Sequence, residues 1–281
     1  QEILEHQIKI TNDPLVDTHI DYYGNIVGTF TTKEYHKELK IDSIIVVEVQ
    51  KKKLPETSIF IEEQWNNLKH LSYQLPYINF LKQEAFSSEK EVYEAINPEQ
   101  KKTNSPYEVA TNLNTFVYEN FKYIKGITNI STTIEEIWNL RAGVCQDFAH
   151  ILLFMLRHMG IPSRYVSGYI CAKKSSMRGE GATHAWVEAY IPDYGWLGLD
   201  PTNNCIVDDY HVRLAVGRNF EDCSPVKGTY KGTAKHRLEV KVNVSYDDDP
   251  NQFKKDLETV LEVDNTPINS YRRFVEMQQQ Q

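Results

Sequence analysis

A cysteine in the stretch RAGVCQDFAH, residues 141–150, has the surroundings of a nucleophile. Cys145 stands just after Gly143 and opens a run whose apolar residues recur at helical spacing, which predicts a long helix from Cys145 to Met159. A thiol reacts as its thiolate, and the positive end of a helix dipole lowers the pKa of a thiol placed there. A helical cysteine without a partner is more often a small buried residue. The chemical interpretation therefore depends on finding a base.

The segment ATHAWVEAYI, residues 182–191, supplies a base in His184. Side chains alternate along a strand, so His184 and Trp186 share one face while Ala185 and Val187 share the other, apolar face. The apolar face is expected to join the core, and His184 is expected to project from the opposite face of a half-buried strand. A lone histidine there is more often a surface or hydrogen-bonded residue, so a third group is needed.

The hairpin AYIPDYGWLGLD supplies a carboxylate in Asp200. A three-residue loop with its glycine in the left-handed region pairs Pro192 with Trp196. That register sets Asp200 opposite Glu188 and places it on the same face as His184. A four-residue loop would put Asp200 on the other face, and the glycine favours the three-residue version.

Thiol, imidazole and carboxylate on three successive elements predict a Cys-His-Asp site. In such a site His184 takes the proton of the Cys145 thiol and later gives it to the leaving group, while Asp200 orients the ring and stabilises the imidazolium. The oxyanion of acyl transfer needs two donors, and the Cys145 N–H at a helix start is a natural first. Gln146 and Asn139 are the candidates for the second, and each is also a plausible structural residue.

Other candidates flank these residues. Gly143 would let a substrate approach the backbone closely. Trp186 would wall the cleft over the histidine, although an aromatic residue on a strand is usually a packing residue. The remaining cysteines have no base at comparable spacing, and we expect free or buried thiols at Cys171, Cys205 and Cys223.

Composition and charge limit the class of protein. The hydrophobic content of 41% is enough for a sizeable core, and the length of 281 residues favours two units. The formal net charge of -8 argues against general binding to nucleic acid or to an anionic membrane.

The cysteines and the apolar runs bear on metal binding and on the cellular location of the protein. The four cysteines form neither a dense disulfide framework nor a Cys-x-x-Cys pair, so a zinc site is a weaker alternative and no cofactor is expected. The early residues lack the order of a signal peptide, and no apolar run approaches the roughly 20 residues that span a bilayer. These features favour a cytoplasmic protein that does not bind a membrane.

Local patterns predict the elements that position the site. The first fifty residues alternate in the manner of an antiparallel β unit, with a turn at Tyr23-Gly24-Asn25. Ser105 followed by Pro106 and Glu108 is typical of a capped helix start, and Thr132 with Glu135 predicts another. Strands are predicted in SRYVSGYICA, ATHAWVEAYI, GWLGLDPT and HRLEVKVNVSY.

The domain boundary is expected near the polar stretch NPEQKKTNSP. This gives a β-rich N-terminal domain over residues 1–100, a catalytic core over residues 101–246 and a polar C-terminal tail over residues 247–281.

Three long motifs resemble a known family. The stretches are RAGVCQDFAHILLFMLRHMGIPSRYVSGYI, THAWVEAYIPDYGWLGLDPTNN and HVRLAVGRNFEDCSPVKGTY. They resemble bacterial transglutaminase-like proteins of the papain-like thiol superfamily, and VDTHIDYYGNIVGTF resembles the β-rich region that precedes the core in that group. The resemblance implies an α+β fold with a papain-like, transglutaminase-like core, in which the Cys-bearing helix packs on an antiparallel sheet. It also implies Cys145 as nucleophile, His184 as base and Asp200 as orienting acid.

The reaction is left open by the resemblance, because the superfamily includes cross-linking enzymes, peptidases, amidases and inactive members. We expect a cysteine-dependent hydrolase, a protease or amidase, that cleaves peptide or amide bonds through a thioester acyl-enzyme. One alternative is a transglutaminase that transfers a glutamine acyl group to an amine. Another is a non-catalytic interaction module, in which loss of at least one of the three residues would be expected.

Overall fold

The computed structural model describes residues 1–56, 59–83, 86–87, 89–129, 132–171, 177–179, 183–232 and 239–246. Two compact units divide the chain, Gln1–Lys52 and Lys53–Gln281. The predicted tail over residues 247–281 lies outside the described residues. No helix in the described ranges combines the length and the apolar character that crossing a bilayer requires.

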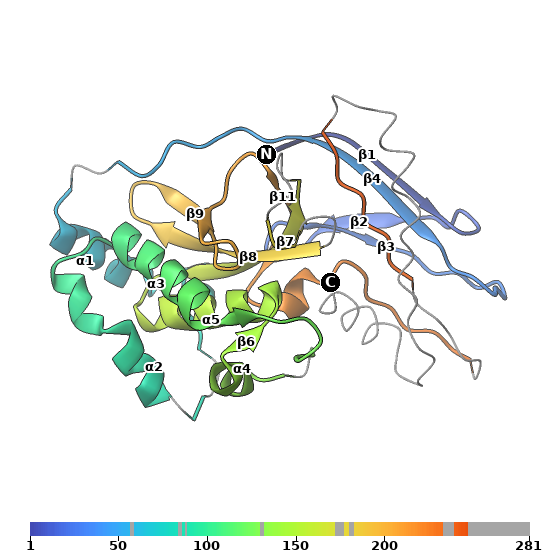
Figure 1. Cartoon of the computed structure of the whole chain (residues 1–281). Helices are drawn as coiled ribbons and strands as arrows, with labels where there is room; N and C mark the ends of the chain where they lie inside the picture. Colours follow the sequence, from blue (N-terminus) through green and yellow to red (C-terminus); the bar gives the residue numbers. More distant parts are fainter. Residues whose placement is uncertain are drawn as a thin grey trace. The chain divides into compact units, whose positions relative to one another are not determined.

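The first unit consists of two antiparallel strand pairs (Figure 1). Strand β1 (Glu2–Ile10) pairs with β4 (Ile41–Glu48), and β2 (Asp17–Ile20) pairs with β3 (Ile26–Thr29). The Asp21 carboxylate accepts hydrogen bonds from the backbone N–H groups of Tyr23 and Asn25, and Gly24 between them has a φ of 87°. The predicted β unit and its turn are therefore confirmed, because the turn residues satisfy the backbone locally.

The second unit is built on a five-stranded antiparallel sheet with the order β10-β9-β8-β7-β11. Its strands are β7 (Ser163–Ile170), β8 (Thr183–Ile191), β9 (Gly195–Asp200), β10 (Cys205–Ile206) and β11 (His211–Gly217). Three of the predicted strands are confirmed as β7, β8 and β9. The predicted strand over residues 236–246 is wrong for its described part, because residues 239–246 are described and have no strand. The strand β11 was not predicted.

Helices, with α5 among them, pack against one face of this sheet (Figure 1). The α-helices are α1 (Ile61–Leu71), α2 (Glu89–Ile96), α3 (Pro106–Asn120), α4 (Ile134–Leu140) and α5 (Cys145–His158). Short 3-10 helices are η1 (Asn79–Leu81), η2 (Pro98–Lys102) and η3 (Phe220–Cys223). A two-residue parallel pair joins β5 (Lys122–Tyr123) to β6 (Ala142–Gly143), directly before α5.

Helix caps show how far local sequence rules reach. The Ser105 cap is confirmed, with the Glu108 side chain completing its capping box. The second predicted start was wrong by one residue, because the cap is Thr133 with Glu136. Thr132 has a different role, since its side-chain oxygen accepts a hydrogen bond from the Asn129 N–H. Two adjacent threonines offer the same chemistry, and packing of the helix selects between them.

Helix α5 forms the centre of the core. It packs on β8 and β7 and against α3. The large side chains of α5 that are fully buried are Phe148, Ile151, Leu152, Leu153, Met155 and Leu156. The helix ends at His158, and Gly160 follows with a φ of 72°, as expected for a helix stop.

The boundary between units lies earlier in the chain than the expected position near residue 100. Leu68 of α1 and Val92 and Ile96 of α2 belong to the same buried cluster as the α5 side chains. Helical residues between 61 and 96 therefore complete the core of the second unit, while the β-rich first unit ends at Lys52. The polar stretch at residues 97–106 contains η2 and leads from α2 into α3.

Candidate active site

Cys145 is the first residue of α5, as predicted. The chain reaches it through β6 and through Val144, whose extended backbone (φ -113°, ψ -176°) serves as the N-cap. The first N–H groups of a helix have no acceptor within the helix, so they point past Cys145 as potential anion donors. Cys145 is 8% exposed. The sulfur thus sits at a buried helix start with limited access to solvent.

Asp147 anchors the backbone around this cysteine. Its Oδ2 accepts hydrogen bonds from the Val144 N–H at 2.8 Å and from the Thr128 hydroxyl at 2.6 Å. Burial raises the pKa of Asp147 to about 6, although both hydrogen bonds act in the opposite direction. A Cβ built on Gly143 would lie 2.4 Å from Asp147 Oδ2. The space that the missing side chain of Gly143 leaves is thus filled by the Asp147 carboxyl group, and the expected role of Gly143 in substrate approach stays a prediction.

His184 and Asp200 contact each other directly. His184 Nε2 lies 2.9 Å from Asp200 Oδ2, and both side chains have no exposed area. The other ring nitrogen, Nδ1, is buried, and no nitrogen or oxygen atom among the described residues hydrogen-bonds to it. Burial disfavours the imidazolium, but Asp200 and then the hydrogen bond and charge of Cys145 outweigh burial and raise the pKa of His184 to about 10. The ring therefore has a carboxylate on one side and the Cys145 thiol as the partner left for Nδ1.

The hairpin that brings them together differs from its predicted register. Ile191 pairs with Gly195, whose φ is 92°, so Glu188 faces Gly198 and not Asp200. The three-residue loop is present, but the glycine is the first strand residue after it and not a loop residue. The difference amounts to two positions along β9. Because side chains alternate with a period of two, His184 and Asp200 still share a face.

Both faces of β8 are buried, which corrects the expectation of a half-buried strand. β8 is the central strand of the five, and only Tyr190 among its residues is partly exposed. Trp186 is 1% exposed and stacks on His184 with ring centroids 6.3 Å apart. Trp186 therefore packs beside the histidine on the sheet, where it supports the ring.

Asp200 accepts hydrogen bonds from several donors. Its Oδ1 accepts from the backbone N–H groups of Thr202 and Asn203, at 2.9 and 3.2 Å. Its Oδ2 accepts from the Asn203 amide at 2.8 Å, in addition to the two histidine contacts at 2.9 and 3.3 Å. Burial raises the pKa of Asp200, but the charge and hydrogen bond of His184 and the hydrogen bond of His211 hold it well below its usual range. A carboxylate held this way stays ionised and fixed in orientation.

The two oxyanion candidates differ in position. Gln146 is 7% exposed and lies in the first turn of α5, adjacent to Cys145. Asn139 lies on an exposed position of α4. Among the hydrogen bonds of the described residues, none joins Asn139 to Cys145, His184 or Asp200, which we call the triad. Gln146 is therefore the better placed of the two candidates for the second oxyanion donor.

Four residues near the triad escaped the sequence reasoning: Tyr123, Arg178, Asn203 and His211. Arg178 lies over the ring of Tyr123, with 5.7 Å between guanidinium carbon and ring centroid, and donates to the Thr202 carbonyl at 3.4 Å. Asn203 had a detectable signal, because Asp-Pro-Thr-Asn is typical of a side-chain-stabilised turn. The motif beginning at His211 was recognised, but its local pattern does not indicate contact with Asp200.

A metal centre is the alternative use of this cluster. The ligand atoms of His184, Asp200 and His211 lie within 4.8 Å of one another, and two imidazoles with a carboxylate are a known ligand set. In this structure the ring nitrogens are within 2.9 and 3.3 Å of the carboxylate, at hydrogen-bond distance. A metal would have to replace both ring N–H groups, so the arrangement fits a hydrogen-bonded network better than a metal site.

The cysteines other than Cys145 are thiols, as expected. None of the four forms a disulfide. Burial and the nearby Asp200 carboxylate raise the pKa of the Cys205 thiol to about 12. Cys223 is buried with its sulfur 3.7 Å from the Tyr165 carbonyl oxygen, so neither thiol is suited to nucleophilic chemistry.

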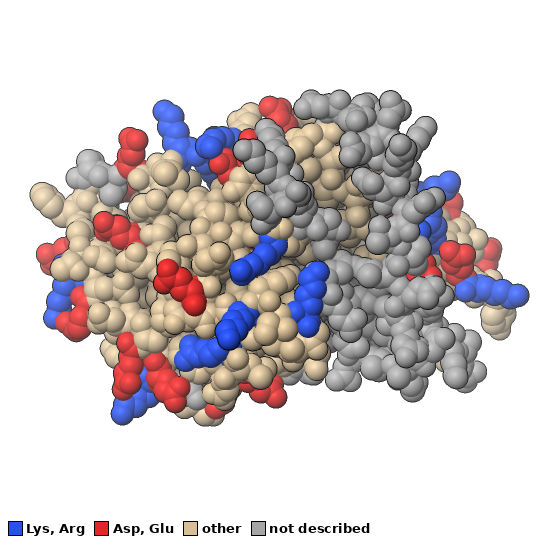
Figure 2. Space-filling model, viewed as in Figure 1, with Lys and Arg blue, Asp and Glu red and all other residues tan. Residues whose placement is uncertain are grey.

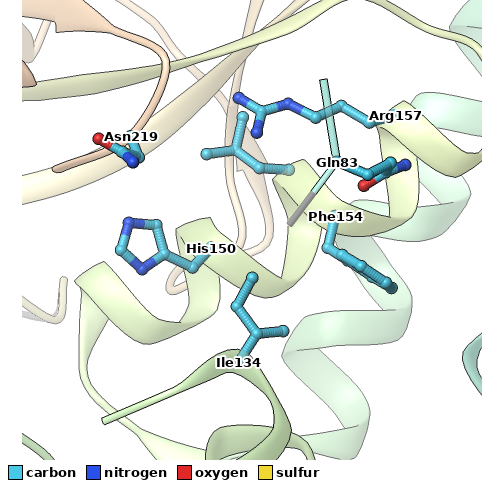
Figure 3. Close-up of a pocket in the computed structure, with 7 residues that line it drawn as sticks. Gln83, Ile134, His150, Phe154, Arg157 and Asn219 are labelled. Atoms are coloured by element: carbon cyan, nitrogen blue, oxygen red, sulfur yellow. The ribbon is translucent and has the colours of Figure 1, made fainter. Parts of the chain in front are cut away.

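A separate small pocket lies along α5 (Figure 3). It is lined by Gln83, Ile134, His150, Leu153, Phe154, Arg157 and Asn219 and has room for about one water molecule. Arg157 beside it donates to the carbonyl oxygens of Lys82, Ser163 and Arg218. These contacts tie three segments to α5, and Cys145 is not among the lining residues. The pocket is thus a structural feature distinct from the triad.

Comparison with known proteins shows the family. The family model of the transglutaminase-like superfamily matches residues 94–201. An uncharacterized protein of Mycobacterium leprae is 31% identical over 230 residues, which cover 81% of this chain and 80% of that protein. An uncharacterized protein of Mycobacterium tuberculosis is 31% identical over 262 residues, which cover 87% of this chain and 82% of that protein. The chain belongs to the transglutaminase-like superfamily.

Two further comparisons involve a solved structure and a named enzyme. The crystal structure of a proposed cysteine protease from Cytophaga hutchinsonii matches with a TM-score of 0.56 at 22% identity, over 79% of this chain and 73% of that chain. A protein-glutamine gamma-glutamyltransferase of Pseudomonas aeruginosa is 34% identical over 101 residues, which cover 34% of this chain and 15% of that protein. The predicted α+β class, a transglutaminase-like core after a β-rich N-terminal region, is confirmed.

Proposed function

We propose that this protein is a cysteine-dependent hydrolase that cleaves peptide or amide bonds through Cys145, His184 and Asp200. The observation that supports it most is the buried His184–Asp200 pair, with Nε2 to Oδ2 at 2.9 Å and the second ring nitrogen left for the thiol at the start of α5. A buried imidazole that is hydrogen-bonded to a carboxylate through one nitrogen and faces a thiol with the other is suited to proton transfer.

The first half of the reaction forms an acyl-enzyme. His184 Nδ1 holds the proton of the Cys145 thiol, and the thiolate sulfur bonds to the carbonyl carbon of the substrate. The oxyanion accepts a hydrogen bond from the Cys145 N–H, and Gln146 is the candidate second donor. When the tetrahedral intermediate collapses, the carbon–nitrogen bond breaks and His184 gives its proton to the leaving amine. A thioester on Cys145 remains.

The second half releases the acyl group. His184 takes a proton from water, the hydroxide oxygen bonds to the thioester carbon, and the carbon–sulfur bond breaks. A carboxylic acid is released, and the Cys145 thiolate remains beside the protonated His184. Asp200 keeps its proton-free form throughout and stabilises the imidazolium. The donors around Asp200 hold the ring orientation in both halves.

Amine transfer is the second candidate function. It is favoured by the 34% identity over 101 residues to the gamma-glutamyltransferase of Pseudomonas aeruginosa. In this reaction the thioester forms in the same way, and a primary amine replaces water as the second nucleophile. The amide product then carries the acyl group of a glutamine side chain, and ammonia is the first product released.

The surface charge is compatible with a protein or peptide substrate. Acidic and basic side chains are interspersed over the described part of the face in Figure 2. The net charge of -8 does not supply the general basic surface that nucleic acids require. We therefore propose a peptide or protein amide as the substrate.

Selective alkylation tests the nucleophile. At about pH 6, more than two units below the ordinary thiol pKa of ~8.5, iodoacetamide is expected to modify Cys145 faster than the partly exposed Cys171. The Cys145→Ser variant provides the blank for site assignment. Equal rates at both cysteines would contradict the proposal.

A product screen then separates the two reactions. Purified protein is incubated with glutamine-containing peptides, with and without a labelled primary amine. Peptide cleavage or ammonia release without amine incorporation supports hydrolysis, and amine incorporation supports transfer. Products that persist in the Cys145→Ser variant would show that the activity belongs to a contaminant.

A further inference from the structure

His211 contacts Asp200 at Oδ2, whereas the backbone N–H groups of the turn bond to Oδ1. His211 is the first residue of β11, its side chain has no exposed area, and its Nε2 lies 3.3 Å from Asp200 Oδ2. On the other edge of the ring, the Asp208 backbone N–H points at Nδ1 over 3.4 Å. A backbone N–H can only donate, so Nδ1 is an acceptor and the ring proton is on Nε2. The His211 ring is therefore a neutral donor aimed at the Asp200 carboxylate.

The groups around this ring are consistent with its neutral form. Burial lowers the pKa of His211, Asp200 acts against this, and the charge of His184 lowers it further. Among the described residues, the titratable groups that face the ring are Asp200 from β9, His184 from β8 and Asp208 from the preceding turn. Tyr210 packs on the ring with 4.7 Å between centroids. Two imidazoles thus share one carboxylate, and only His184 has a route to the thiol.

Packing holds His211 in this position. Its ring meets Trp186 edge-on, with centroids 5.2 Å apart, and Trp186 in turn stacks on His184. A Cβ on Gly168 of β7 would lie 2.4 Å from Trp186 Cη2 and 2.2 Å from the Val212 carbonyl oxygen. The absence of a side chain at Gly168 therefore makes room for Trp186 and for the backbone that follows His211.

We propose that His211 is a positioning residue, whose Nε2–H fixes Asp200 Oδ2 in the orientation that keeps His184 bonded and its Nδ1 turned to Cys145. The inference rests on the proposed function of Cys145 as the nucleophile. His211 touches no reacting atom in this scheme and acts through Asp200. A hydrogen bond to a charged group is among the stronger ones, so its loss is expected to lower the reactivity of Cys145 by about ten- to a hundredfold.

Two conservative variants of the full chain separate the contacts of His211. In His211→Gln the amide nitrogen can occupy the place of Nε2 and donate to Asp200. In His211→Asn the shorter side chain can reach only the place of Nδ1, so the contact with Asp208 is kept and the one with Asp200 is lost. The readout is the rate of iodoacetamide alkylation at Cys145 from about pH 5 to 9, a range that brackets the ordinary thiol pKa, with circular dichroism and thermal melting as folding controls.

The expected result is slow alkylation of Cys145 near neutral and acidic pH in His211→Asn and a rate close to wild type in His211→Gln. A wild-type rate in His211→Asn, slow alkylation in both variants, or poor folding of both would overturn the proposal, because the role would then be absent or merely structural. If wild-type Cys145 itself reacts no faster than Cys171, the proposed function fails instead. The two failures are thus distinguishable.

Discussion

His184 Nε2 lies 2.9 Å from Asp200 Oδ2, and the two side chains come from neighbouring antiparallel strands with no exposed area. Their contact joins β8 to the end of β9, where the turn after Asp200 supplies backbone N–H donors to Oδ1. A charged pair out of contact with water is weakly screened. Changes to either partner should therefore have large effects on activity and on the pH dependence of stability.

Asp200→Asn is expected to abolish most of the activity. The amide can bond the wrong tautomer of His184, and loss of the corresponding charge in a serine protease triad lowers kcat by about 10⁴-fold. The measurement is kcat on whichever substrate the product screen identifies. Asp193→Asn at the exposed hairpin turn is the matched control, because Asn tolerates the positive φ of 62° there. Similar losses in both variants would argue against a specific role for Asp200.

The free energy of unfolding is expected to fall as pH rises from about 3.8 to about 6, because of Asp147. Burial raises the pKa of this carboxyl from 3.8 to about 6, so its contribution is fully present below 3.8 and is lost as pH rises through the folded value. The shift corresponds to about 3 kcal/mol over this window. Urea unfolding of wild type and Asp147→Asn at several pH values measures it. An Asn variant with the same pH dependence as wild type would contradict this assignment.

Stability is also expected to fall between neutral and alkaline pH, because of His184. Its pKa is raised from 6.5 to about 10 by Asp200 and Cys145, so the stabilisation is fully present below 6.5 and is lost as pH rises through about 10. The upper bound of the effect is roughly 5 kcal/mol. Thermal melting from neutral to alkaline pH tests it, and His184→Gln, which keeps a donor to Asp200, should show a flatter profile. No difference between the two profiles would rule out the His184–Asp200 pair as the source.

Gly143→Ala is expected to destabilise the fold, since its Cβ would lie 2.4 Å from Asp147 Oδ2. Overpacking of this kind costs about 1–3 kcal/mol. Gly228→Ala is the control, because nothing lies within 4 Å of a Cβ there. Shortening the clashing group in Gly143→Ala/Asp147→Ser should recover part of the loss relative to Asp147→Ser alone. If Gly143→Ala instead keeps full stability and loses only activity, the substrate-approach role first expected for Gly143 would be supported.

Much of the site was predictable because its rules are local. The start of α5 at Cys145 and its stop before Gly160 follow from apolar spacing and from a residue with positive φ. The shared face of His184 and Asp200 follows from the period of two, which survived an error of two positions in register. The choice between Thr132 and Thr133 as the helix cap depends on a difference of one residue, which local rules do not resolve.

The sequence by itself thus determined the identity of the three chemical groups, the helix that carries the thiol and the parity of the strands that carry the other two. Only the tertiary structure decided that β8 is buried on both faces, that Gly143 makes room for Asp147 and that His211 shares the Asp200 carboxylate. The physical reason is the distance along the chain over which the interactions act. Backbone hydrogen bonding and side-chain periodicity act over a few neighbouring residues, whereas β11 reaches the triad through β7, and its place in the sheet depends on contacts between distant segments.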